Sequence, residues 1–403
     1  MDKQKRNSSA LENDCYSLAE QIQNPGQKMN QKKKIRVAVL FGGRSSEHEV
    51  SLTSALSILK HIDQTKYRVL PIKISKEGRW QALPDLKALN SYQALESSKG
   101  ALVLVGNPQS KGLIKLEKNV PDSSAEDWST EPIDVVFPIL HGTFGEDGKV
   151  QGLLDLAGLP CVGGGVLASA LGMDKILMKQ IFLQNDLPSP DFLYFLRKDW
   201  EKSAEVILKG VVKEVGFPCF VKPANTGSSV GISKAHDEKE LIRAIDQAGL
   251  YDRKILVEKA VDARELECAV LGNDEPKASV VGEVIPCNEF YDYEAKYLMD
   301  GSKIFIPADI PDSVSQTIQN MSIAAFKALD CAGMGRVDFL LERKTDRIFI
   351  NEINTIPGFT PISMYPKLWE ASGIPYPELI DRLIELAMER HQDLNRSKFS
   401  RNP

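Results

Sequence analysis

The stretch "KKIRVAVLFGG" at residues 33–43 constrains the fold more than any other segment. After a basic flank it is almost entirely apolar, does not alternate with polar residues, and ends at two glycines. A strand of this kind is buried on both faces, as in a parallel sheet covered by helices. The next segment, "EVSLTSALSILKHI" (49–62), has the period of an amphipathic helix and predicts the crossover that a parallel sheet requires. The chain therefore begins, at about residue 35, as an α/β unit.

Further strands extend this first unit. Apolar runs predict strands at 67–75, 101–106 and 133–142, and a helix at 148–160. Residues 76–132 are mixed and turn-rich, and we interpret them as an insertion without an assigned function. We predict an N-terminal α/β domain over 35–160, whose ligand lies at the carboxyl ends of the strands, after a polar, poorly ordered leader over 1–34.

The pattern changes after residue 160. Short strands dominate, which is typical of an α+β, mainly antiparallel module. Helices are expected at 166–188, near 237–249, and over 311–333 and 376–392. Two strands joined by the charged turn "RKTD" (343–346) separate the last two helices. We divide this part into a central domain, 161–255, and a C-terminal domain, 256–403, and so predict three domains of α/β and α+β class.

Charge argues against nucleic acid and membrane partners. The 50 Lys and Arg residues against 55 Asp and Glu leave a net charge of −5, so no basic excess is available for a polyanion. No apolar run approaches the roughly 20 residues of a membrane span, and the N-terminus has no apolar core of signal-peptide length. The 6 cysteines lie far apart, which favours reduced thiols over a zinc site or disulfides. We expect a cytoplasmic protein that acts on small molecules.

Polar side chains interrupt the last two predicted strands. Because residues two apart in a strand share a face, Arg336 lies with Asp338, and Glu352 lies with Asn354. If the strands pair antiparallel, one surface carries three hard oxygen donors, which suit Mg²⁺ held together with phosphates and water. The alternative is an ordinary solvated sheet face on which Arg336 neutralises the carboxylates. The hairpin alone favours neither interpretation.

A glycine-rich turn points to an anion. The segment "FVKPANTGSSVGI" (220–232) places Lys222 at the end of a β-rich run, followed by a Gly-Ser-Ser-x-Gly turn. Small residues allow backbone N–H groups to close around an anion, and the Ser228 and Ser229 hydroxyls add donors. A plain glycine hairpin is the alternative. Neither the G-x-x-x-x-G-K-[ST] phosphate loop nor a G-x-G-x-x-G after the first strand is present, so a bound nucleotide requires another arrangement.

Two more segments follow predicted strands. "FGGRSSEHEVS" and "HGTFGEDG" place Glu47 and His141 at the mouth of one sheet. A single histidine is more often structural than catalytic, but this position gives it more weight. Residues 288–308 are charged and aromatic without a clear period, which is typical of a long mobile loop that covers an active site.

These motifs resemble those of the D-alanine–D-alanine ligases, members of the ATP-grasp superfamily. The seven segments that carry the resemblance are "FGGRSSEHEVS", "HGTFGEDG", "GMDK", "VKPANTGSSVG", "EFYDYEAKY", "GRVDF" and "NEINTIPGFT". They occur in the family's order and span residues from about 35 to 390. The resemblance implies an ATP-grasp fold of three domains, with ATP between two antiparallel sheets, and a homodimer.

The resemblance also implies a role for each matching residue. ATP contacts are implied for Lys175, Lys222, Ser229 and Lys296 at the phosphates, for Glu258, Lys259 and Val261 at the adenine, and for Glu265 at the ribose. Two Mg²⁺ ions, for which Mn²⁺ can substitute, would be held by Asp338, Glu352 and Asn354. The first D-alanine would contact Glu47 and His141, and the second Ser363 and Met364. Glu47, Ser228 and Tyr297 would latch the mobile loop, while Arg336 and the Gly358 backbone would stabilise the oxyanion.

The implied reaction is the ATP-dependent joining of two D-alanines through a D-alanyl phosphate, which releases ADP and phosphate and serves peptidoglycan precursor synthesis. It requires positioning and charge neutralisation rather than a protein nucleophile, because ATP activates the carboxylate. Related ligases use D-lactate or D-serine as the second substrate, but the "YDYEAKY" loop with Tyr297, and less strongly "SMYP", favour D-alanine.

Two more distant alternatives are weaker. An ATP-grasp ligase for another carboxylate would not need the substrate-side motifs around Glu47 and His141. A catalytically inactive nucleotide-binding regulator predicts losses among five residues, all of which are present: Lys222, Arg336, Asp338, Glu352 and Asn354.

Overall fold

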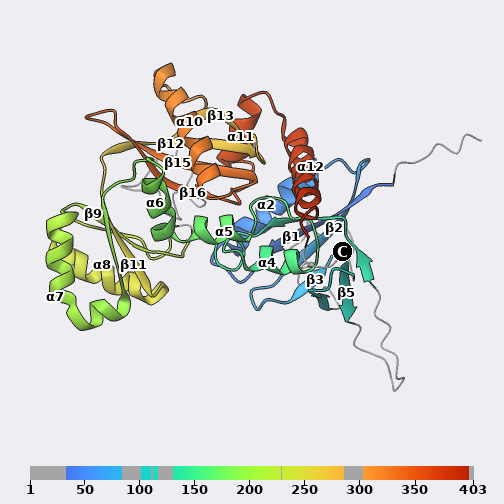
Figure 1. Cartoon of the computed structure of the whole chain (residues 1–403), viewed down its shortest axis with the longest axis horizontal. Helices are drawn as coiled ribbons and strands as arrows, with labels where there is room; N and C mark the ends of the chain where they lie inside the picture. The colour runs from blue at the N-terminus through green and yellow to red at the C-terminus, as the bar shows by residue number, and fades with distance from the viewer. Residues whose placement is uncertain are drawn as a thin grey trace, which may run out of the picture. The chain divides into compact units, whose positions relative to one another are not determined.

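The computed structural model describes residues 33–83, 101–109, 112–116, 130–227, 229–285 and 303–398. Figure 1 shows three sheets flanked by helices. Within the described ranges, no helix combines the length and the apolar character needed to cross a bilayer.

The N-terminal sheet has seven strands in the order β6-β5-β4-β3-β2-β1-β7. Its strands are β1 Ile35–Gly42, β2 Tyr67–Ile74, β3 Trp80–Ala82, β4 Ala101–Leu104, β5 Gly112–Leu116, β6 Thr130–Pro132 and β7 Val135–Ile139. β1 pairs in parallel with β2 and β7, as the continuous apolar run predicted. β3 to β6 add antiparallel strands beyond β2, so the described parts of the predicted insertion extend the sheet. Helices α2 (His48–His61) and α4 (Lys149–Leu156) follow β1 and β7, as predicted.

The central sheet is antiparallel, with the order β10-β9-β11-β8. Its strands are β8 Phe192–Leu196, β9 Cys219–Pro223, β10 Ser233–Ala235 and β11 Lys254–Lys259. Helices α7 (Arg197–Glu214) and α8 (Glu238–Tyr251) share a core with it. The boundary that we placed at 255/256 falls inside β11, so the central sheet continues to Lys259.

The C-terminal sheet is antiparallel in the order β14-β13-β12-β15-β16. Its strands are β12 Ala263–Gly272, β13 Lys277–Ile285, β14 Lys303–Phe305, β15 Gly333–Glu342 and β16 Ile348–Asn354. Its helices are α10 Asp312–Ala328, α11 Met364–Ala371 and α12 Tyr376–Leu394. β15 and β16 form the predicted antiparallel hairpin, with Arg336 opposite Asn354 and Asp338 opposite Glu352.

The single helix expected at 166–188 is wrong. The structure has α5 (Val166–Met173) and α6 (Lys175–Gln184), separated at Asp174, whose backbone is extended. The Asp174 carboxylate accepts hydrogen bonds from the Ile176 and Leu177 N–H groups and so caps α6. Both halves are apolar, so periodicity did not reveal the break, which places Lys175 in the first turn of α6.

Two other helix predictions need correction. We expected no helix between residues 188 and 237, but α7 lies there and has 18 residues, of which only Trp200 and Val211 are buried. This buried stripe is too sparse to mark a helix by its period. The helix expected to end at Gly333 ends at Ala328, because Asp330 takes a left-handed backbone conformation with φ 55°.

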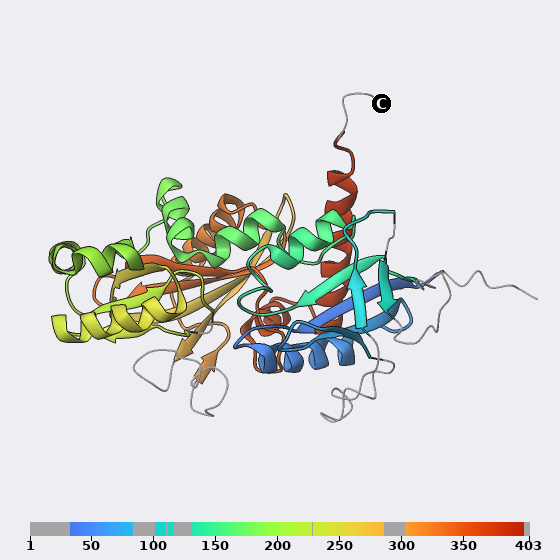
Figure 2. The ribbon, with the colours of Figure 1, turned by 90° about the horizontal axis from the view of Figure 1, so that it is seen from below.

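One large hydrophobic cluster joins the N-terminal sheet to the C-terminal end of the chain. Phe137 on β7 packs edge-on against Phe359, with 6.1 Å between ring centroids. Helix α12 packs against α2 and β7, and Figure 2 shows this red helix beside the blue N-terminal elements. The segment after β16 is therefore held against the carboxyl ends of β1 and β7.

Candidate active site

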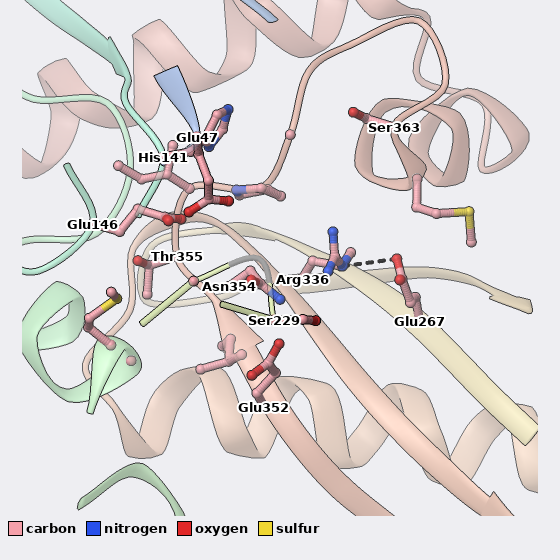
Figure 3. A pocket seen from close by; sticks show the side chains of 18 of the residues that line it. Glu47, His141, Glu146, Ser229, Glu267, Arg336, Glu352, Asn354, Thr355 and Ser363 are labelled. Carbon is pink, nitrogen blue, oxygen red and sulfur yellow. Dashed lines mark ion pairs between the residues drawn. The ribbon is translucent and has the colours of Figure 1, made fainter. Parts of the chain in front are cut away.

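Two neighbouring cavities collect the predicted site residues. The first, of about 420 Å³, lies where the loops after β1 and β7 meet the end of β16 (Figure 3). The second, of about 640 Å³, lies between the central and C-terminal sheets. Both are lined by Ser229, Glu267 and Glu352. Predicted residues on the first are Glu47, His141, Lys175, Ser229, Arg336, Glu352, Asn354, Gly358, Ser363 and Met364. Those on the second are Lys222, Ser229, Glu258, Lys259, Val261, Glu265, Asp338 and Glu352.

Three predicted residues cannot be placed. Ser228, Lys296 and Tyr297 lie outside the described residues, as does most of the predicted mobile loop. Their roles stay predictions.

Glu47 and His141 come together at one end of the first cavity. Glu47 precedes α2, His141 follows β7, and both are buried. Burial lowers the pKa of His141 to about 4, so the ring is neutral near pH 7. Its Nε2 lies 3.3 Å from the Ser54 Oγ, which also accepts a hydrogen bond from the Phe359 N–H. A neutral, anchored imidazole can donate to a bound carboxylate without acting as a fixed charge.

Glu146, in the motif that contains His141, completes this group. Burial, reinforced by the nearby Glu47 carboxylate, raises the pKa of Glu146 to about 8. The Gly142 N–H donates to its Oε2 at 2.6 Å. Glu146 is therefore mainly protonated at neutral pH and adds no second negative charge beside the Glu47 carboxylate.

The loop around Gly227 closes on Glu47. A Cβ at Gly142 or at Gly227 would collide with the Glu47 carboxylate, so only glycine allows both backbones to approach it. In the same loop, Ser229 has φ 60° and Gly231 has φ 75°, which are backbone conformations that turn successive N–H groups toward an anion.

Arg336 is fixed between two carboxylates. Its Nε and Nη2 donate to the two oxygens of Asp338 at 2.7 and 2.8 Å. Its Nε also lies 2.9 Å from Glu267 Oε2, the ion pair drawn in Figure 3. Since the guanidinium is planar and always charged, two anchors aim it precisely enough to act on an oxyanion.

Asp338, Glu352 and Asn354 meet on one face of the β15–β16 hairpin. Asp338 lies opposite Glu352, and Asn354 Nδ2 donates to Asp338 Oδ2 at 3.0 Å. Among the described residues, no three His, Cys, Asp or Glu side chains converge as a metal site, so a metal here would need the amide as third donor. Two carboxylates and an amide oxygen are ligands that fit Mg²⁺.

Lysines line the phosphate side. Lys175 Nζ lies 3.6 Å from Glu352 Oε2 and donates to the Thr226 carbonyl at 2.9 Å. Lys222 Nζ donates to Glu258 Oε1 at 2.7 Å. Burial alone would lower the pKa of Lys222, but Glu258 together with Glu352 and Glu265 outweighs it, and the pKa is raised. The Lys222 ammonium is therefore available as a charged partner for phosphate.

The loop after β16 shapes the remaining wall. Ser363, at the start of α11, accepts a hydrogen bond from the Thr360 N–H at 2.9 Å. A Cβ at Gly358 would lie 2.8 Å from the Ser363 Oγ, so a side chain there would displace the hydroxyl. Glycine thus leaves the Gly358 backbone accessible beside Ser363.

Three site residues were missed by the sequence analysis: Glu146, Lys179 and Glu267. Glu146 stood inside a quoted motif, and Glu267 lies two residues after Glu265, so strand alternation could have placed both carboxylates on one face. Lys179 lies inside an apolar helical run, and no local signal distinguishes it from a solvated lysine.

Comparison with known proteins identifies the family. The family described as "D-ala D-ala ligase N-terminus" matches residues 36–164, and "D-ala D-ala ligase C-terminus" matches residues 181–385. The chain belongs to the D-alanine–D-alanine ligase family. This membership confirms the family, the ATP-grasp fold and the ligase activity that the motifs predicted.

Relatives of this ligase cover almost its whole length. It is 50% identical over 366 residues to a D-alanine–D-alanine ligase of Acetivibrio thermocellus, covering 89% of this chain and 97% of that one. A solved D-alanine–D-alanine ligase of Coxiella burnetii shares 36% identity with a TM-score of 0.79, over 91% of this chain and 97% of that one. The VanG D-Ala:D-Ser ligase of Enterococcus faecalis shares 34% with a TM-score of 0.78, over 88% and 100%. The family uses ATP and Mg²⁺.

Proposed function

We propose that this ligase joins two D-alanines through a D-alanyl phosphate in the first cavity, with ATP in the second. The observation that carries the proposal is the shared wall: Ser229, Glu267 and Glu352 line both cavities, so a phosphate held in one can meet a carboxylate held in the other. Joining the activated carboxylate to an amine before water reacts requires this proximity and a covered site.

The first cavity would hold the amino acids. The Glu47 carboxylate would bind the ammonium of the first D-alanine, and neutral His141 would donate to its carboxylate. Because Glu146 is mainly protonated near pH 7, it adds no second negative charge beside Glu47 at this end of the first cavity. Ser363 and Met364 would contact the second D-alanine from α11.

The second cavity would hold the nucleotide. Lys222 and the loop at Ser229 would bind phosphates in this cavity, and Lys175 would reach them from the adjoining first cavity. The adenine would face Glu258, Lys259 and Val261, and the ribose would contact Glu265. Asp338, Glu352 and Asn354 would hold two Mg²⁺ ions, or Mn²⁺ in their place. When bound, these ions would neutralise charge on the phosphates.

The chemistry then needs no protein nucleophile. A carboxylate oxygen of the first D-alanine takes the terminal phosphoryl group, and ADP leaves. The second D-alanine gives its ammonium proton to solvent, and its amine attacks the carbonyl carbon. The C–O bond to phosphate then breaks, and the extra proton on the new amide nitrogen goes to the departing phosphate. Arg336 and the Gly358 N–H would stabilise the oxyanion between these two events.

The mobile loop would cover this site. Lys296 and Tyr297 on it, with Ser228, would complete a latch to Glu47. The close packing of Gly227 against the Glu47 carboxylate supports a latch at this position.

D-alanine is our proposed acceptor, with D-lactate and D-serine as the alternatives. An assay that mixes ATP, Mg²⁺ and D-alanine with each competing acceptor tests this. We expect phosphate release that depends on D-alanine, with D-alanyl-D-alanine as main product. ATP turnover indifferent to D-alanine would contradict the ligase proposal, and preferential ester or D-alanyl-D-serine formation would contradict only the acceptor.

We also propose the wider setting that the resemblance implied: a homodimer, a cytoplasmic location, a role in peptidoglycan precursor synthesis, and domains over 35–160, 161–259 and 260–403 after the leader. The end at 259 replaces 255 because β11 pairs within the central sheet.

A further inference from the structure

A fully buried lysine lies beside the nucleotide cavity. Lys179 on α6 has no exposed surface, yet lysine is almost never fully buried unless it is paired. An ammonium group removed from water is strongly destabilising without close anionic and hydrogen-bonding partners. No step proposed so far uses Lys179.

Lys179 belongs to a closed ring of polar contacts. Its Nζ lies 2.5 Å from Glu258 Oε2 and donates to the Asn351 carbonyl at 3.0 Å. The other Glu258 oxygen, Oε1, accepts from Lys222 Nζ at 2.7 Å. Lys222 Nζ in turn lies 3.5 Å from Asn351 Oδ1. The ring joins α6, two strands of the central sheet and β16 of the C-terminal sheet.

The charges in this ring do not cancel. Within the ring one carboxylate serves two ammonium groups, which leaves one positive charge in excess there. The other carboxylates that act on Lys222, Glu352 and Glu265, line the cavity itself. Burial opposes ionisation of Glu258, but the two lysines outweigh it and hold the pKa of the carboxyl below its usual value. Burial lowers the pKa of Lys179, and the Glu258 carboxylate works against that shift. Lys222 and Glu258 line the nucleotide cavity and Lys179 does not, so the excess charge is presented through Lys222.

We propose that Lys179 is a positioning residue for nucleotide phosphates. By binding one oxygen of Glu258, it prevents that carboxylate from neutralising Lys222 alone, so Lys222 keeps charge for an anionic phosphate. Its hydrogen bond to the Asn351 carbonyl also links β16, the strand that contains Glu352, to Glu258 on β11 of the central sheet. This inference rests on the proposed binding of ATP in the second cavity.

This role differs from a purely structural one. If Lys179 only stabilised the fold, its removal would weaken the binding of every ligand of the cavity by a similar factor. A positioning role for Lys222 affects ligands that carry phosphate and spares the nucleoside. The ratio of ADP to adenosine affinity therefore separates the two.

The test is calorimetric titration of the full chain with ADP and with adenosine, both in excess Mg²⁺. Lys179→Met keeps the length of the side chain and removes its charge. We expect ADP binding to weaken about tenfold and adenosine binding to change less than about twofold. Lys66→Met is the matched control, because it removes the charge of an exposed lysine whose ion pair with Asp381 lines neither cavity. It should leave both affinities unchanged.

A second variant, Lys179→Gln, covers the case in which Lys179→Met fails to fold, because it removes the charge but keeps a hydrogen-bond donor for Glu258 and the Asn351 carbonyl. The ADP-to-adenosine affinity ratio should fall about tenfold in this variant as well. A ratio equal to the native one in either variant would overturn the proposal. A native protein that binds adenosine but forms no ligation product would refute the proposed function while leaving this comparison intact.

Discussion

The native protein should lose stability between pH 6 and pH 9 as Glu146 ionises, and Glu146→Gln should not show this loss. Burial, and then the neighbouring Glu47 carboxylate, raise the pKa of Glu146 to about 8, against hydrogen bonds from the Gly142 and Ile356 backbone. The folded protein therefore binds this proton far more tightly than the unfolded chain, whose glutamates have an ordinary pKa of 4.5. Its contribution to stability is complete below pH 4.5 and is lost as pH rises through about 8.

The size of the loss follows from the two pKa values. Proton linkage between about 8 and 4.5 gives roughly 2.7 kcal/mol less stability at pH 9 than at pH 6. With an unfolding entropy of about 2.1 cal/mol/K for each of roughly 370 folded residues, this is a difference of about 3 °C in the thermal midpoint. Glutamine keeps the shape of the protonated acid and cannot ionise.

Scanning calorimetry at pH 6 and pH 9, at constant ionic strength, measures this difference. The midpoint of the native protein should fall by about 3 °C more than that of Glu146→Gln over this interval. Glu77→Gln is the control, because Glu77 is exposed and the hydrogen bond from the Ser75 hydroxyl lowers its pKa, so it does not titrate in this range. Equal falls in the native protein and in Glu146→Gln would refute the reasoning.

Two further changes test the centre of the site. Asn354→Ala should raise the Mg²⁺ concentration for half-maximal turnover about tenfold, because it removes the amide that would bind the metal and that donates a hydrogen bond to Asp338. The thermal midpoint should stay nearly unchanged, because little buried apolar surface is lost. An unaltered Mg²⁺ dependence would exclude Asn354 from the metal site. Glu267→Gln should lower kcat about tenfold with little change in the KM for ATP, since it weakens one of two anchors of Arg336. A native kcat in that variant would show that Asp338 alone positions the guanidinium.

The hairpin at β15 and β16 shows how far local pattern reaches. Alternation placed Arg336 with Asp338 and Glu352 with Asn354, and the observed register agrees. The same rule would have included Glu267 beside Glu265. Helices were predicted less accurately from the sequence. Helix α7 was missed because few of its residues are buried, and the break at Asp174 was missed because the sequence is apolar on both sides of it.

Side-chain partners distant in sequence could not be predicted from spacing. Lys179 reaches Asn351 across 172 residues, and the Phe359 N–H reaches Ser54 across 305. The protonated state of Glu146 is of the same kind, because it depends on burial beside Glu47 rather than on the residues next to it in the chain.

The sequence by itself determined the family, the order of the sheets and most of the predicted residues that line the two cavities, because these depend on motifs and on periods of two and 3.6 residues that a short segment carries alone. Only the tertiary structure decided which groups share a carboxylate, which glutamate keeps its proton and which lysine is buried. Those properties are set by desolvation and by distances between separate elements, and both appear only once the sheets have packed against one another.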